Sequence, residues 1–301
     1  MPDHHRGFTM VHVRRFSIRA RAAVFLLCLL AAGLVQGCTT NAATGRRQLN
    51  VISRQREIAL GESAKAEIAA QYGGPVDDPY MQSYVREVGM SLVEHVEGDY
   101  ADLPWEFTVL DSDVINAFAL PGGKVFITRG LVERLDDEAM LAGVLGHEIG
   151  HVTAEHADKQ LSQKLLFTGM LAGAAVASGR SDSDFVRAGV PLLVGLGGSG
   201  FLLKFGRNDE LEADALGMRY MARAGYDPAA QRDVMNVLEE ATKTSGGRGM
   251  ELFSTHPYPE TRIRKIEERL AREYPPETRA GLVRHQDRFH ASALSRLPSP
   301  K

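Results

Sequence analysis

Apolar residues recur at helical spacing in several segments of this 301-residue chain. In residues 79–96, for example, Tyr84, Val85, Val88 and Leu92 fall on one face of a helix. Similar patterns occupy residues 58–72, 208–224, 227–242 and 259–273. These segments predict a largely helical protein.

The sequence predicts one further helix from residues that favour a helix N-terminus. Asp136 and Asp137 can offer carboxylates to the free amides at a helix N-terminus. We expect this helix to continue to about Ala157.

Two short segments, residues 105–110 and 124–128, are rich in β-forming residues. The turn sequence Pro121-Gly122-Gly123 lies between them and predicts a hairpin or a strand with a tight bend. The expected fold class is therefore α+β, predominantly helical, with a small sheet or hairpin and one core.

Two glycine-containing stretches, residues 165–179 and 188–203, are uncharged. Both are shorter than the roughly twenty residues that a membrane-spanning helix needs. We favour close packing within the domain or a mobile flap over residues 165–203, and a membrane hairpin remains an alternative.

The N-terminal region has the pattern of a secretory signal. Arg14, Arg15, Arg19 and Arg21 precede an uncharged run at residues 22–35. This run is short for a retained membrane anchor, which is the alternative. The sequence Leu-Val-Gln-Gly-Cys ending at Cys38 resembles a bacterial lipoprotein signal. That resemblance implies a lipid on Cys38, and Thr39 after it implies delivery to the outer membrane.

The expected organisation follows from these features. Residues 1–37 would be a lipoprotein signal peptide, 38–50 a lipidated tether, 51–275 one domain, and 276–301 a loosely attached C-terminal tail. The only cysteines are Cys28 and Cys38, so the mature chain would contain no disulfide.

Composition narrows the function. With 44% hydrophobic and 24% charged residues, the chain has the composition of a folded protein. Its net charge of −3 provides no basic field, so we expect no nucleic-acid partner.

The sequence HEIGH supplies the candidate chemistry. His147 and His151 are four residues apart and would share one face of a helix, where both imidazoles could reach one ion. Glu148 would lie beside them, placed to act on a water. Two nitrogen ligands, a water and a base are the parts of a zinc hydrolase.

A third ligand is expected from the helix at residues 208–224. Glu210 and Asp214 share a face, so Glu210 could bind the metal and Asp214 could accept a hydrogen bond from a ligand histidine. We expect Glu212 to point toward solvent. The rival motif HExxHxxGxxH fails, and we expect His156 to be structural and to face away from the other two histidines.

HEIGH at residues 147–151 and ELEAD at residues 210–214 together resemble the HtpX-type family of zinc metalloproteases. NAFALPGG from Asn116, STHP from Ser254, and Arg-Ile at residues 262–263 add to the resemblance. It extends over roughly residues 50–270, and within the family the chain resembles lipid-anchored periplasmic members such as LoiP.

The resemblance implies a zincin-like, gluzincin-like core in which a small edge strand flanks the active-site helix. It implies one Zn²⁺ per chain on His147, His151 and Glu210, with Glu148 as the base. By the same resemblance, His256 would hydrogen-bond the developing oxyanion. The edge strand that takes up substrate would consist of Ala117, Phe118, Ala119 and Leu120.

The expected function is a zinc-dependent metalloendopeptidase, lipid-anchored at the periplasmic face of the bacterial outer membrane. It would cleave unfolded or misassembled envelope proteins with a water that Glu148 activates, and outer-membrane assembly machinery is a possible partner. One alternative is a periplasmic chaperone or assembly factor with a latent or structural zinc site. A zinc aminopeptidase is a further alternative, for which the sequence offers no residue that would bind the substrate's free amine.

Overall fold

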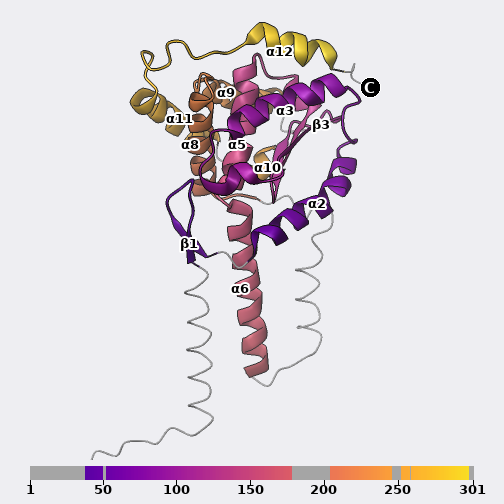
Figure 1. The fold of residues 1–301 in the computed structure, drawn as a ribbon, viewed down its shortest axis with the longest axis vertical. Helices are drawn as coiled ribbons and strands as arrows, with labels where there is room; N and C mark the ends of the chain where they lie inside the picture. Colours follow the sequence, from indigo (N-terminus) through magenta and orange to yellow (C-terminus); the bar gives the residue numbers. More distant parts are fainter. Residues whose placement is uncertain (1–37, 50–51, 178–203, 246–251, 258, 298–301) are drawn as a thin grey trace, which may run out of the picture.

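The computed structural model describes residues 38–49, 52–177, 204–245, 252–257 and 259–297. Helices predominate in this part of the chain, and a small sheet lies among them (Figure 1). The predicted α+β class is confirmed.

The sheet has three strands in the order β3-β5-β4. The central strand β5, Lys124–Thr128, pairs in parallel with β3, Glu106–Leu110, and antiparallel with β4, Ala117–Leu120. Gly122 and Gly123 turn the chain between β4 and β5 with φ angles of 75° and 83°, which glycine adopts without strain. The hairpin expected from the sequence is present, and β4 is an edge strand.

The predicted helices are present with small shifts of their ends. The long helices are α2 (Arg54–Gln71), α3 (Pro79–Val93), α5 (Glu138–Thr153), α6 (His156–Ala177), α8 (Arg207–Arg223), α9 (Ala230–Ser245) and α11 (Pro259–Glu273). The short ones are α4 (Arg129–Val132), α10 (Leu252–Thr255) and α12 (Gln286–Ser292), with 3₁₀ helices at Gly98–Asp102 and Leu294–Arg296. A second, two-stranded sheet consists of β1 (Cys38–Thr40) and β2 (Arg47–Leu49).

Helix α5 lies at the centre of the body, and every one of its residues is buried. It contacts α8, α9, α3 and the edge strand β4. A strand beside the helix that carries HEIGH is the arrangement expected from the sequence. Glycines allow α5 and α8 to approach closely, since a Cβ on Gly217 would lie only 2.9 Å from the backbone of Gly146 and His147.

The predicted end of α5 is wrong. The helix stops at Thr153, and Glu155 then takes a left-handed conformation with φ 56°. This bend starts the new helix α6 at His156, which projects away from the body in Figure 1. The predicted stretch at residues 165–203 therefore begins within α6, and its part beyond residue 177 lies outside the described residues.

The chain after Cys38 is more ordered than the expected tether. Residues 38–49 form the β1–β2 hairpin, and Asn41 and Ala43 at its turn are buried. The Asn41 side-chain amide donates hydrogen bonds to the Tyr100 hydroxyl and the Thr153 carbonyl, both at 2.8 Å. These bonds fasten the hairpin to the end of α5.

The C-terminal residues also differ from the prediction of a loose tail. Phe289 and Ala293 are fully buried, and α12 contacts α3 and α5. Arg284 pairs with Asp137 and Asp233 at 2.6 and 2.8 Å. Apolar burial and ion pairs thus hold this region to the body through the last described residues.

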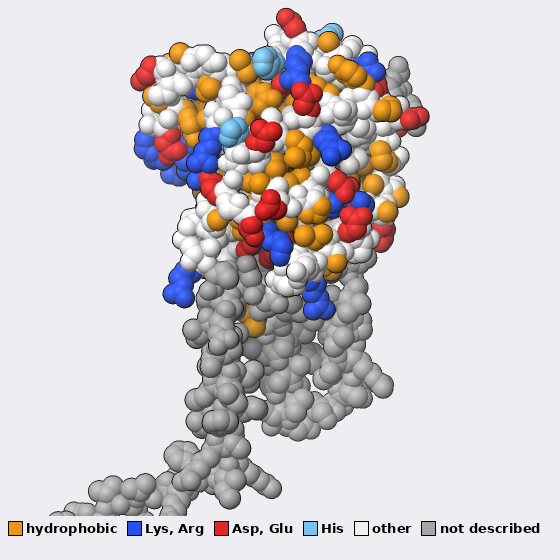
Figure 2. All heavy atoms as spheres, in the orientation of Figure 1, with side chains coloured by type: hydrophobic (Ala, Val, Ile, Leu, Met, Phe, Trp, Pro, Cys, Tyr) orange, Lys and Arg blue, Asp and Glu red, His pale blue; other side chains and the backbone are white. Residues whose placement is uncertain are grey.

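The surface drawn in Figure 2 carries acidic and basic side chains interspersed with apolar ones. Among the described residues, no helix combines the length and apolar composition needed to cross a membrane.

Candidate metal centre

The two histidines of HEIGH come from neighbouring turns of α5. His147 and His151 are 5% and 3% exposed, and their Nε2 atoms are 3.1 Å apart. The four-residue spacing places both rings on one helical face, as the sequence predicts.

Glu210 approaches these histidines from α8 and is fully buried. One carboxylate oxygen lies 3.5 Å from His147 Nε2 and the other lies 3.5 Å from His151 Nε2. The structure therefore brings together the three residues expected to bind metal.

His256 adds a fourth donor atom from the residue after α10. Its Nδ1 lies 3.3 Å from His147 Nε2 and 3.2 Å from Glu210 Oε1. The ligand atoms of His147, His151, Glu210 and His256 all lie within 4.8 Å of one another. The resemblance placed His256 at the active site as an oxyanion donor, but the sequence did not predict it as a fourth donor atom beside His147 and Glu210.

Several separations between these donor groups are close to those around a tetrahedral zinc ion. Bonds of about 2.0–2.1 Å in a tetrahedral zinc site place neighbouring donors about 3.3 Å apart. The Nε2 atoms of His147 and His151 are 3.1 Å apart, and His256 Nδ1 lies 3.3 Å from His147 Nε2 and 3.2 Å from Glu210 Oε1. Glu210 lies 3.5 Å from His147 Nε2 through Oε2 and 3.5 Å from His151 Nε2 through Oε1. Three imidazoles and a carboxylate at these separations suit a zinc-like cation.

Asp214 and Arg262 surround the outer side of this cluster. Asp214 Oδ1 lies 2.9 Å from His147 Nδ1, the contact expected from the sequence. Arg262 is buried and reaches both carboxylates, at 2.7 Å from Asp214 and 2.9 Å from Glu210. In the sequence, Arg262 stands out only through the family resemblance, which does not predict that it neutralises these two charges.

These contacts decide the protonation of the acids and of His147. Burial would raise the pKa of Glu210, but His256 and the Arg262 charge hold it well below its usual range. Asp214 is likewise held ionised against burial, chiefly by Arg262. Burial and Arg262 favour neutral His147, yet hydrogen bonds to Asp214 and Glu210 outweigh them and raise its pKa to about 9. A proton or a metal ion is therefore favoured between these groups.

His156 and Glu212 lie differently from their predicted positions. The bend at Glu155 returns the His156 ring to the cluster, where its Nδ1 lies 2.9 Å from His151 Nδ1. Glu212 does not simply face solvent, because its carboxylate lies 3.1 Å from His156 Nε2. Both expectations assumed straight helices and failed where α5 ends.

Glu148 is placed beside the cluster and is only 1% exposed. Its Oε2 has no hydrogen-bond partner among the described residues, and its Oε1 is 3.7 Å from His256 Nε2. A cavity of about 20 Å³ lined by His147, Glu148 and His256 adjoins it. This is room for about one water molecule and not for a peptide.

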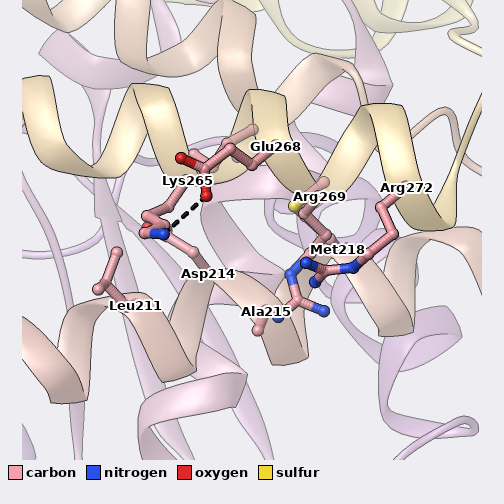
Figure 3. A pocket seen from close by; sticks show the side chains of 9 residues that line it. Leu211, Asp214, Ala215, Met218, Lys265, Glu268, Arg269 and Arg272 are labelled. Carbon is pink, nitrogen blue, oxygen red and sulfur yellow. Dashed lines mark hydrogen bonds and ion pairs between the residues drawn. The ribbon is translucent and has the colours of Figure 1, made fainter.

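A larger groove of about 230 Å³ lies between α8 and α11. Figure 3 shows its rim of Lys265, Glu268, Arg269 and Arg272, with Lys265 paired to Glu268. Asp214 lines this groove too, but His147, Glu148 and His256 do not. The groove therefore shares Asp214 with the surroundings of the cluster but is not lined by the proposed base Glu148.

A helix bearing HExxH, joined by a carboxylate from a second helix, is the arrangement of a metallopeptidase. Residues 79–270 match Peptidase family M48, and the chain belongs to this family of metalloproteases. The match confirms the metalloprotease part of the sequence prediction.

Two relatives show how far the similarity extends. Over 195 residues the chain is 33% identical to the beta-barrel assembly-enhancing protease of Escherichia coli (strain K12), covering 62% of this chain and 38% of the relative. Over 235 residues it is 34% identical to the mitochondrial metalloendopeptidase OMA1 of Schizosaccharomyces pombe, covering 75% of this chain and 65% of the relative. The chain thus spans less than two thirds of each relative's length.

Proposed function

We propose that this protein is a zinc-dependent metalloendopeptidase, with one Zn²⁺ held by His147, His151 and Glu210. The observation that carries the proposal is the convergence of these donors next to Glu148, whose buried Oε2 has no hydrogen-bond partner among the described residues. A purely structural site needs no such free carboxylate.

The chain's own residues supply the remaining chemistry. When bound, the zinc ion would act as a Lewis acid on the scissile carbonyl and acidify the attacking water. Glu148 takes the proton of that water on its free Oε2 and delivers it to the leaving nitrogen. Asp214 orients His147 through its Nδ1 and so directs Nε2 to the ion.

His256 would act on the oxyanion only after it moves. In the structure its Nδ1 lies 3.2 Å from Glu210 Oε1, where it would hold a bound ion at the place that a catalytic site keeps for water. Its side chain could then turn toward the carbonyl oxygen when a substrate enters. This two-position role accommodates both its place in the structure and the role expected from the resemblance.

We further propose unfolded or misassembled envelope proteins as substrates. An extended segment would add to β4, the edge strand Ala117–Leu120, which contacts α5. The name of the Escherichia coli relative, an assembly-enhancing protease, supports a role alongside outer-membrane assembly machinery. Attachment through a lipid on Cys38 at the periplasmic face of the outer membrane, as in HtpX-type members such as LoiP, belongs to the same proposal.

One observation favours a second candidate, a chaperone or assembly factor with a latent zinc site. The cluster has four protein donors and leaves no place for a water on a four-coordinate ion, and the adjoining cavity of about 20 Å³ is too small for a peptide. In this reading, binding of clients would be the main activity and hydrolysis would need a further signal.

The decisive experiment compares the unchanged chain with Glu148→Gln. We expect both to bind one zinc by metal analysis, whereas cleavage of unfolded casein should fall by a factor of about 10² or more in the variant. Chelation should abolish cleavage by the unchanged chain, and added zinc should restore it.

Full casein cleavage by Glu148→Gln would end the proposed mechanism. The assembly-factor candidate would be favoured by two results together. The unchanged chain would leave casein intact, and Glu148→Gln would rescue a deletion strain. An aminopeptidase would remove single residues from peptide N-termini, which product analysis by mass spectrometry distinguishes.

A further inference from the structure

The two HEIGH histidines have different partners at their outer nitrogens. His147 Nδ1 faces the Asp214 carboxylate at 2.9 Å. His151 Nδ1 faces another imidazole, that of His156, at 2.9 Å. His151 therefore depends on whatever orients His156.

The hydrogen bonds beyond His151 run in one direction. For His151 to offer its Nε2 lone pair to an ion, its proton must lie on Nδ1, so that nitrogen donates to His156 Nδ1. The proton of His156 then lies on Nε2, which donates to Glu212 at 3.1 Å. Glu212 in turn accepts from Arg46 of the β1–β2 hairpin, with which it forms an ion pair.

His156 is buried between these partners. Its ring is 1% exposed, so its two nitrogens depend on His151 and Glu212 for their hydrogen bonds. A single set of tautomers satisfies every hydrogen bond from His151 to Arg46.

The hairpin is anchored so that Arg46 has a fixed position. Asn41 holds the Thr153 carbonyl at the end of α5, and Arg219 of α8 donates to the Ala43 carbonyl at 2.8 Å. Gln48 hydrogen-bonds Glu155 at the bend before α6. Figure 1 shows the hairpin beside the start of α6 and below α8.

We propose that the β1–β2 hairpin is a positioning element of the metal site, and that Arg46, Glu212 and His156 hold His151 in its zinc-binding orientation. The proposal rests on the zinc site of the proposed function. Because the hairpin begins at Cys38, displacement of the N-terminal segment would weaken zinc binding without any change at a ligand.

The test measures zinc affinity of the whole chain by competition with a chromogenic chelator. His156→Phe should weaken zinc binding by about 10- to 100-fold, the range for partners of metal ligands. Arg46→Ala, at a half-exposed position, should weaken it by about two- to fivefold. Arg47→Ala removes the same charge from the exposed neighbouring residue and should leave the affinity unchanged.

A double-mutant comparison separates this chain from a general effect on the fold. Arg46→Ala should have no further effect on zinc affinity once His156 is Phe, because the link is already broken. His156→Gln should retain more affinity than His156→Phe, since an amide can accept from His151 and donate to Glu212. The metal-free Arg46→Ala protein should melt like the unchanged one.

The outcomes decide between two failures. If the unchanged chain binds one zinc and cleaves casein, but Arg46→Ala matches Arg47→Ala, the positioning role of the hairpin is wrong and the proposed function stands. The positioning role would also be overturned if Arg46→Ala reduced zinc affinity equally in the unchanged chain and in the His156→Phe variant. If the unchanged chain binds no zinc, both proposals fail together.

Discussion

The metal cluster contains buried charged side chains whose orientations are held by neighbouring residues. Glu210 and Asp214 are buried acids four residues apart, and Arg262 neutralises both from α11. Without Arg262 these carboxylates would face a large desolvation cost. The cluster therefore depends on an arginine that binds no metal.

His256 makes a testable contribution at this scale. Because its Nδ1 lies among the donor atoms, His256→Ala should remove one ligand and open the cavity beside Glu148. We expect a chelator to remove zinc about tenfold faster or more from this variant than from the unchanged chain.

The measurement is the rate of zinc transfer to a coloured chelator, with His285→Ala as the control. His285 lies outside the cluster, just before α12. An unchanged rate in His256→Ala would mean that His256 does not bind the ion.

At the scale of elements, the packing of α5 against α8 determines whether the ligands converge. Gly146 and Gly150 of α5 face Gly217 and Ala213 of α8, so the two backbones meet with no side chain between them. A Cβ on Gly150 would lie 2.8 Å from the Ala213 carbonyl oxygen. This close approach brings Glu210 to the HEIGH histidines.

Gly217→Ala should therefore destabilise the protein although alanine favours a helix over glycine. The new Cβ would meet backbone atoms 2.9 Å away, which can relieve the overlap only by moving α5 and α8 apart. We expect a loss of about 1–3 kcal/mol in the free energy of unfolding, measured by urea denaturation.

Ala215→Val on the same helix is the control, because Ala215 borders the groove of about 230 Å³ and has room for a larger side chain. A Gly217→Ala protein as stable as the unchanged chain would show that this contact does not limit the packing.

Another element-scale feature is the junction of α2 with α6. Asp158 of α6 lies near Glu57 of α2 and Glu155 at the bend, with Arg54 as the neighbouring cation. Burial, reinforced by the charges of Glu57 and Glu155, raises the pKa of Asp158 to about 8. At neutral pH this carboxyl is mostly protonated.

The sign of the pH effect follows. The pKa of an aspartate in an unfolded chain is about 3.9. Between this pKa and the folded pKa of about 8, the folded chain binds more protons than the unfolded chain. The free energy of unfolding therefore falls as pH rises, by at most about 1.4 kcal/mol per pH unit. Asp158→Asn removes this pH-dependent loss, so the variant should gain more stability over the unchanged chain at pH 8 than at pH 5, both in the metal-free form. Urea denaturation at several pH values measures it, with exposed Asp102→Asn as the control.

At the scale of the whole molecule, the cluster joins three separate parts of the chain. Its donors come from α5, from α8 and from the residue after α10, which are distant in sequence. An ion bound there would link the central helix to the elements around it, and so act on the stability of the whole body.

We therefore expect zinc to raise the melting temperature of the metal-free chain. Free zinc at a hundred times its dissociation constant would add about 2.7 kcal/mol to the free energy of unfolding. Scanning calorimetry with and without zinc measures the shift, and magnesium, which prefers oxygen ligands, is the control ion. Equal melting temperatures in zinc and in buffer alone would contradict a metal site in this cluster.

The sequence by itself determined most of the long helices, the turn between β4 and β5, and the HEIGH and ELEAD residues, because helical periodicity and turn chemistry are local properties. It also determined which face of each helix carries His147, His151, Glu210 and Asp214, since residues four apart always align.

Only the tertiary structure decided the position of His256, the charge neutralisation by Arg262, the return of His156 to the cluster and the docking of residues 38–49. Each depends on contacts between segments far apart in the chain or on the single bend at Glu155. No local pattern encodes such contacts, because their energy exists only once the α5–α8 packing has formed.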